Sequence, residues 1–168
     1  MSNDTQQNKG LEDQIPAMGG RILVEVLRDG PNGPVVIQRS EASNLIVNSG
    51  KKQVWRKVMG INTRLFKWFR LGKNSAAATS GGTNVKSALA SASLKTASSM
   101  TVDAGRTFKW VVSYPSGALS LSAAALKEVV LMDSISTPGG SILMRCVFAT
   151  VSKTTADKLK ITYKARIT

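Results

Sequence analysis

A basic segment between residues 51 and 73 carries the most evident chemistry of the sequence, because it holds eight cations and no acidic side chain. Four aromatic residues are interleaved with these charges, namely Trp55, Phe66, Trp68 and Phe69. Cations beside exposed rings are typical of single-stranded nucleic-acid binding, since bases stack on the rings while phosphates meet the charges. Apolar neighbours in the same segments favour another interpretation, in which the rings are core contacts of a helix and a strand. We adopt this second interpretation for the rings.

The eight cations of this segment would repel one another if nothing neutralised them. We therefore expect them to dock onto an acidic partner surface. No RNA-recognition or zinc-finger signature accompanies them, so nucleic acid is the less favoured partner. The candidate docking residues are Lys51, Lys52, Arg56, Lys57, Arg64, Lys67, Arg70 and Lys73.

The chain has few residues that are suited to catalysis or to metal binding. There is no histidine and there are only 10 acidic residues, which removes the usual general base, the commonest metal ligand and most paired-carboxylate schemes. The single cysteine, Cys146, excludes an intramolecular disulfide and has no imidazole to activate it, so we expect a buried structural thiol. No phosphate-binding glycine loop and no nucleophile elbow occurs. We expect a protein that is not an enzyme and has no cofactor or metal.

The composition indicates one domain and an arm. The chain has 168 residues, of which 42% are hydrophobic, and its formal net charge is +13. Residues 1–20 are polar and carry three acids against one lysine, and such a segment cannot bury enough surface to fold alone. We predict an extended N-terminal arm over residues 1–20, with Leu11 and Ile15 as candidate docking residues, and a single β-sandwich domain over residues 21–168.

Membrane insertion and secretion are not expected from this sequence. No apolar run is long enough to cross a bilayer. Residues 1–10 lack both a basic leader and the apolar centre of a signal peptide. We therefore expect no membrane partner.

The domain is predicted to begin with a β-hairpin. Residues 21–28 (RILVEVLR) and 35–39 (VVIQR) are rich in β-branched and aliphatic side chains. Residues 29–34 (DGPNGP) between them are typical of a tight turn. Residues 44–47 (NLIV) could extend the sheet.

One substantial helix is predicted over residues 49–59. Its apolar side chains form a stripe at helical spacing, and its cations occupy the other faces. Asn48 or Ser49 is the expected N-cap, and Gly60 is the expected terminating residue.

Alternating polar and apolar positions recur along the rest of the chain. A small-residue loop over residues 72–83, a short helical turn over 85–90 and a turn over 136–141 separate them. Seven or eight short strands predict a mainly β protein, an antiparallel β-sandwich of jelly-roll or Greek-key type with one short helix. The further predicted strands are residues 65–71, 106–114, Leu126–Met132, 142–147 and Lys158–Ile167.

The last predicted strand has the clearest alternation. Its apolar side chains point one way and its four cations point the other. We expect the basic side to face solvent, and lysines there are typical of an edge strand protected from unwanted pairing. These cations are Lys158, Lys160, Lys164 and Arg166.

Several segments together resemble a group of small structural proteins of tailed bacteriophages. Residues 44–51 (NLIVNSGK) are similar to the turn "N-x-V-V-N-x-G" that leads into a helix in that group. Residues 126–141 (LKEVVLMDSISTPGGS) resemble its hairpin, with valines where the group often has a glycine. Residues 143–148 (LMRCVF) and 153–161 (KTTADKLKI) resemble the two strands that follow. In order and spacing, the resemblance covers about residues 44–168.

The resemblance implies a virion component. We expect a capsid cement or decoration protein on the outer head surface, present as a homo-oligomer, with a trimer as the guess. Its partner would be the major capsid protein or another virion protein, and the arm and the basic residues would bridge neighbouring capsomers. Two alternatives stay open at this point: a tail, baseplate or tail-fibre protein, and a nucleic-acid-binding module that uses residues 51–73.

Overall fold

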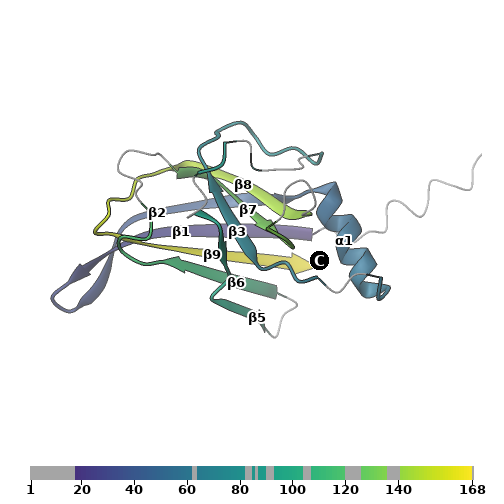
Figure 1. The fold of residues 1–168 in the computed structure, drawn as a ribbon, viewed down its shortest axis with the longest axis horizontal. Coiled ribbons are helices and arrows are strands. Elements are labelled where there is room, and N and C mark those ends of the chain that lie inside the picture. The colour runs from purple at the N-terminus through teal and green to yellow at the C-terminus, as the bar shows by residue number, and fades with distance from the viewer. Residues whose placement is uncertain are drawn as a thin grey trace, which may run out of the picture.

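A computed structural model describes residues 18–61, 64–81, 85, 87–89, 93–103, 107–119, 126–135 and 141–167. The described chain is mainly β with one short helix, as predicted (Figure 1). The elements are β1 (Met18–Gly30), β2 (Gly33–Ile46), α1 (Asn48–Val58), β3 (Trp68–Gly72), β4 (Lys95–Thr96), β5 (Ser99–Asp103), β6 (Thr107–Tyr114), β7 (Leu126–Met132), β8 (Ile142–Val151) and β9 (Lys158–Ile167).

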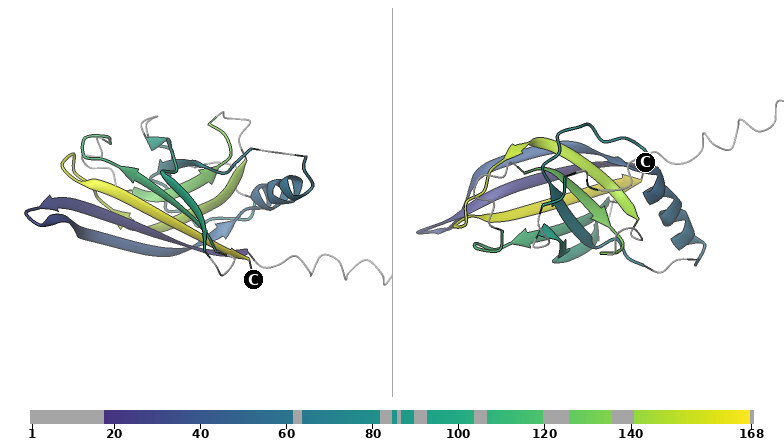
Figure 2. Two further views of the ribbon diagram at one scale, coloured as in Figure 1. Left: turned by 90° about the horizontal axis from the view of Figure 1, so that it is seen from below. Right: turned by 45° about the horizontal axis from the view of Figure 1, so that its top comes forward.

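The strands form one antiparallel nine-stranded sheet in the order β4-β3-β7-β8-β2-β1-β9-β6-β5. The sheet is strongly curled, so that its two halves face each other across the core (Figure 2). Strand β2 belongs to both halves, because it pairs with β1 along most of its length and with β8 only through Leu45 and Ile46. The prediction of antiparallel strands is therefore confirmed, and the arrangement is a single curled sheet.

The two ends of this sheet are brought together by one stretch of chain. Strands β4 and β5 lie at opposite ends of the strand order, yet only Ala97 and Ser98 separate them in the sequence. The amide of Ala97 donates to the Lys67 carbonyl at 2.7 Å, and the amide of Ser98 donates to the Val111 carbonyl at 2.7 Å. Neither strand was predicted, because both are short and mostly polar.

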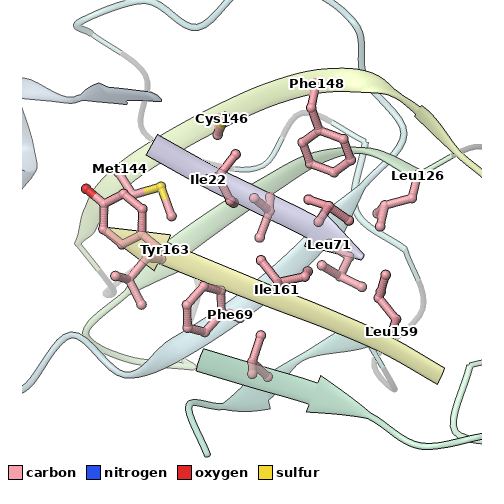
Figure 3. Close-up of a cluster of buried hydrophobic side chains, with 14 of the residues drawn as sticks. Ile22, Phe69, Leu71, Leu126, Met144, Cys146, Phe148, Leu159, Ile161 and Tyr163 are labelled. Carbon is pink, nitrogen blue, oxygen red and sulfur yellow. The ribbon is translucent and has the colours of Figure 1, made fainter. Parts of the chain in front are cut away.

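The main core lies between the two halves of the sheet (Figure 3). Strands β1 and β9 supply aliphatic and aromatic side chains from one half, and β3, β7 and β8 supply them from the other. Burial of such side chains is the main stabilising term of a fold like this one. The large side chains buried there include Ile22, Ile46, Phe69, Leu71, Tyr114, Leu126, Leu131, Met144, Leu159, Ile161 and Tyr163.

A smaller apolar cluster lies on the outer face of β7. It contains Val130 and Met132 of β7 together with Val47, Val85 and Ile142. The alternation predicted for Leu126–Met132 is confirmed from residue 128 onward, whereas Leu126 lies in the main core with Val129 and Leu131 because the pairing with β8 is irregular between Leu126 and Glu128. Both faces of the strand are buried, because the chain after β3 covers the outer one. Ala88 there forms a bridge with Gly72. The described part of residues 85–90 is therefore paired with β3, and the predicted helical turn there is wrong.

Helix α1 packs against the end of β8. Its N-cap position is Val47, which makes no side-chain cap, so the prediction of Asn48 or Ser49 as cap is wrong. The Ser49 hydroxyl instead donates to the Ile142 carbonyl at 3.2 Å, which ties the helix to β8. Gly60 follows the last turn with φ of 71°, as expected for a terminating glycine.

The start of β1 and the position of β9 in the sheet differ from the predictions. Strand β1 begins at Met18, three residues before the predicted strand, whereas residues 1–17 and 136–140 lie outside the described residues. Strand β9 is an interior strand between β1 and β6, so its expected edge position is wrong. Its basic side does face solvent, as predicted, since Lys160, Lys164 and Arg166 are exposed.

Candidate docking surfaces

The exposed side of helix α1 holds three of the predicted docking residues, Lys51, Lys52 and Arg56. Trp55 lies among them with 46% of its surface exposed, so the expectation that it is a core residue is wrong. Phe66 and Phe69 are buried, which confirms the same expectation for these two rings. The helix lies at the end of the sheet (Figure 1), and its exposed side carries these three cations and one ring.

Lys57 turns away from these three cations. Its ammonium lies 5.3 Å from the centroid of the Phe66 ring. The ammonium nitrogen is buried and has no hydrogen-bond partner among the described residues. Burial lowers the pKa of Lys57 below its ordinary value, and Asp133 opposes that shift through its negative charge.

The other predicted docking residues do not join the helix surface. The Lys67 ammonium lies 5.8 Å from the centroid of the Trp68 ring, and Arg70 is half-buried on β3 opposite Val130. Arg64 and Lys73 are exposed before and after β3. Leu11 and Ile15 lie outside the described residues. The structure therefore divides the eight cations of residues 51–73 among several places.

A second basic surface lies on the outer face of the sheet. The alternation of the last predicted strand indicated only the part of this surface that lies on β9. The register places Arg21 of β1 directly opposite Lys164 of β9, and Lys164 directly opposite Lys109 of β6. We call Arg21, Lys164 and Lys109 the cation row. Beside it, Arg166 and two hydroxyl residues line a shallow hollow of about 390 Å³, where Gly19 contributes no side chain. Like charges directly opposite each other in a sheet are destabilising, so this surface favours an anionic partner.

An apolar pocket opens between α1, β5 and β6. It has a volume of about 380 Å³. Two aromatic residues form part of its wall, of which Phe66 is buried and Trp110 is half-buried. Three aliphatic wall residues are more exposed, namely Leu65 at 58%, Met100 at 47% and Val102 at 65%. Sequence patterns could not reveal this pocket, because its walls come from α1, the chain before β3, and the strands β5, β6, β8 and β9.

The hairpin of β1 and β2 extends beyond the body of the sheet (Figure 1). Near its tip, Val35, Val36 and Ile37 are 56%, 45% and 46% exposed. Three consecutive exposed apolar residues are unusual on a surface that meets only water. Ion pairs tie the base of the tip to the body, from Arg28 to Asp157 at 2.8 Å and from Lys158 to Asp29 at 2.6 Å.

A buried ion pair joins β7 and β8. Arg145 donates to Glu128 at 2.5 Å, and its two terminal nitrogens donate to the carbonyls of Ala76 and Ala77 at 3.0 Å each. The side chains of Arg145 and Glu128 are 2% and 0% exposed. The contacts hold the chain after β3 against the sheet, which indicates a structural role.

Cys146 is buried in the core, as expected. Burial raises the pKa of its thiol to about 12, although the charge of Arg145 acts in the opposite direction. The neutral thiol donates weakly to the Ser43 carbonyl at 3.4 Å. Cys146 is therefore a packing residue at neutral pH, since the thiolate is the reactive form.

The described residues contain no cluster of three or more acidic or cysteine side chains that could hold a metal ion. No helix in the described part of the chain is long and apolar enough to span a membrane. No protein-family model matches the chain, and neither a curated protein nor a solved structure matches it. The surfaces themselves are therefore the basis for a functional proposal.

Proposed function

We propose that this chain is a non-enzymatic virion structural protein of a tailed bacteriophage, and specifically a capsid cement protein on the outer head surface. The observation that carries the docking role is the cation row, in which three cations face one another across β1, β9 and β6. Their mutual repulsion is relieved when an acidic protein surface covers them. The phage assignment itself rests on the resemblance of residues 44–168.

The proposed mechanism is mechanical. Several modest contacts would bridge neighbouring capsomers, and each interface formed only with the assembled shell would stabilise it. The cation row and the cations of α1 would increase the association rate and fix the orientation. The exposed apolar tip at Val35, Val36 and Ile37 would add buried area. The protein would act as a homo-oligomer, with a trimer as the expected size.

Binding to expanded phage heads tests the electrostatic part of this proposal. We expect binding at low salt that weakens strongly when salt is raised, because exposed charges are screened. The variant Lys164→Glu should weaken binding, whereas Lys73→Glu, away from the cation row, should not. Equal binding at low and high salt would show that the cation row is not the docking surface.

The number of copies per virion separates the head assignment from a tail assignment. A cement protein is expected in hundreds of copies, and a tail, baseplate or fibre protein in a handful to dozens. Quantitative staining of virion proteins on a gel measures this number. A low copy number would contradict the cement proposal and leave the virion assignment standing.

A second candidate function has one specific observation in its favour. Trp55 is 46% exposed beside Lys51, Lys52 and Arg56 on α1, and an exposed ring among cations suits single-stranded nucleic acid. This candidate predicts quenched Trp55 fluorescence and steeply salt-dependent binding when an oligonucleotide is added. An unchanged emission spectrum at low salt would exclude it.

We also propose a more specific fold class for the domain. We regard the curled sheet as an antiparallel sandwich of jelly-roll or Greek-key type. Such sandwiches present loops and hairpins at their ends, where docking segments are carried on a rigid scaffold. The hairpin of β1 and β2 and the helix α1 occupy opposite ends of this scaffold (Figure 1).

A further inference from the structure

The apolar pocket between α1, β5 and β6 has walls that no described residue covers. Leu65, Met100 and Val102 expose about half or more of their surface there. A volume of about 380 Å³ is in the range of pockets that hold small ligands or a few side chains. Exposed apolar walls of this kind are stabilised by an apolar occupant.

The pocket also contains an unsatisfied cation. Lys57 lies on its wall, and the buried Lys57 ammonium has no hydrogen-bond partner among the described residues. Asp133 is the described carboxylate that acts on it, and it does so only through its charge. A buried ammonium without an acceptor is costly. The Lys57 side chain as a whole is half-buried, so a small rotation would bring its ammonium to the pocket, and an occupant that combines apolar side chains with a carboxylate would give it an acceptor.

The N-terminal arm begins beside this pocket. Met18 is paired with Ile167 at the end of β9, two residues from Ala165, which lines the pocket. Ala165 is paired in turn with Phe108, another lining residue. Leu11 lies seven positions before Met18, and an extended chain over seven positions spans about 23–25 Å. Residues 11–15 can therefore reach the pocket of their own molecule.

The sequence of this part of the arm matches the pocket. Residues 11–15 are Leu-Glu-Asp-Gln-Ile, so that one apolar side chain stands at each end and two carboxylates lie between them. The arm has a net charge of −2 and the rest of the chain a net charge of +15, which together give the total of +13. A short tether also makes the local concentration of the arm high, in the millimolar range.

We propose that residues 11–15 occupy this pocket within their own molecule, with Leu11 and Ile15 against its apolar wall and a carboxylate of Glu12 or Asp13 accepting a hydrogen bond from Lys57. The contact holds the arm against the body of the free protein. Of the cation row only Lys109 borders the pocket, and the apolar tip of the hairpin is not part of it. The proposed contact uses Lys57 and the apolar wall, so it does not depend on the function proposed above.

Disulfide trapping distinguishes the possible occupants. Oxidation of the double variant Ile15→Cys, Val102→Cys should give a cross-link within one chain, seen on a denaturing gel without a change to dimer mass. The double variant Ile15→Cys, Val35→Cys is the control, because Val35 lies at the opposite end of the molecule, and it should not cross-link within the chain. A cross-linked dimer would show that the arm of a second copy fills the pocket, and no cross-link would show that the arm does not enter it. Either result would overturn the proposal.

Trp110 reports on the same contact, since it lines the pocket. In the background Trp55→Phe, Trp68→Phe it is the one remaining tryptophan. A chain that starts at Met18 should bind a synthetic peptide of residues 1–17 with a saturable change in Trp110 emission, and the full chain should not respond to the peptide. Lys57→Gln in the shortened chain should weaken peptide binding about tenfold, while Lys52→Gln, on the exposed side of α1, should leave it unchanged. Equal binding by these two variants would contradict the role of Lys57.

Discussion

At the residue scale, the pair of Arg145 and Glu128 joins three parts of the chain that are far apart in the sequence. The pair connects β7 with β8, and Arg145 also holds the carbonyls of Ala76 and Ala77 after β3. Both charges are removed from water, so neither can be lost alone without leaving the other uncompensated. Their contribution to stability is therefore conditional on the presence of both.

The variant Glu128→Gln tests this dependence. It keeps the shape of the side chain but leaves the Arg145 charge buried without a counter-charge, and we expect it to lower the free energy of unfolding by about 3–5 kcal/mol. Chemical denaturation measures this loss. Glu41→Gln is the control, because Glu41 pairs with Arg39 on the surface, where both side chains are at least half exposed. We expect no measurable change there. Equal effects of the two substitutions would contradict the structural role of the buried pair.

A second prediction at this scale concerns Asp157 and the pH dependence of its contribution to stability. Its side chain is 2% exposed. Hydrogen bonds from Arg28 and from the hydroxyl and amide of Thr154 hold its pKa well below the ordinary value of 3.8. The folded protein therefore binds a proton at Asp157 less readily than the unfolded chain does. Its stabilising contribution is fully present above the unfolded pKa and is lost as the pH falls towards the folded one.

We accordingly expect the stability difference between the native protein and Asp157→Asn to depend on pH. The difference should be largest above about pH 5 and should shrink progressively below about pH 4. Denaturation at a series of pH values measures it. The variant Thr154→Val, which removes one of the three hydrogen bonds, should show a smaller difference with the same trend. A difference that stays constant down to about pH 2 would contradict the lowered pKa.

The sequence contained part of the evidence for the buried pair. Arg145 is the one charged residue of β8, and Glu128 follows Lys127 in the otherwise apolar β7. Such charges are rarely fully buried unless they are paired. Their partnership could not be read from the sequence, because irregular pairing between Leu126 and Glu128 shifts the register of β7 against β8. A shift of one residue moves every side chain to the other face.

At the element scale, helix α1 reaches the sheet through Gly50. A Cβ atom at this position would lie 2.4 Å from the Leu143 carbonyl oxygen and 2.6 Å from Leu143 Cα. These are backbone atoms of β8, which cannot rotate away. The absence of a side chain therefore sets how closely the helix approaches the strand.

Gly50→Ala gives two opposing expectations. Helix propensity alone predicts stabilisation by about 1 kcal/mol, whereas the clash with β8 predicts destabilisation of about 1–3 kcal/mol. We expect the clash to dominate, and thermal unfolding gives the sign. Gly19→Ala is the control, because no atom would lie within 4 Å of its new Cβ. A more stable Gly50→Ala variant would show that the helix can move away from β8 at little cost.

The elements differ in how far the sequence predicts them. Strands with regular alternation, such as β6, β7 and β9, are predicted within a few residues because burial of one face imposes the period of two. Strands β4 and β5 were missed because they are short and mostly polar, and only their pairing with the distant strands β3 and β6 defines them. The interior position of β9 was missed for a similar reason, since lysines on a solvent face do not show which strands lie beside it.

At the scale of the whole molecule, the excess of positive charge has a spatial arrangement that the sequence does not reveal. The basic segment over residues 51–73 is the densest run of cations in the chain, yet the fold distributes its side chains over α1, the apolar pocket and β3. The cation row instead combines residues from three strands that are up to 143 positions apart, from Arg21 to Lys164. Only the register brings them together, and composition cannot supply the register.

The last prediction concerns the cation row and tests whether the charge of Lys164 serves partner binding or the stability of the fold. Lys164 lies between Arg21 and Lys109, so Lys164→Glu replaces two repulsive pairs with two attractive ones. We expect the free energy of unfolding to rise by about 0.2–1 kcal/mol for each pair at low salt, and the gain to fade as salt is added. Chemical denaturation at two salt concentrations measures both effects.

The same substitution four residues earlier on β9 should have the opposite sign. Lys160 lies directly opposite Glu25 of β1, so Lys160→Glu replaces an attractive pair with a repulsive one and should destabilise the protein. If both variants lost stability equally, Lys164 would have a structural role that its exposed position does not indicate. If Lys164→Glu gains stability while it loses binding to an acidic partner, the native protein keeps an unfavourable charge arrangement that a bound partner relieves.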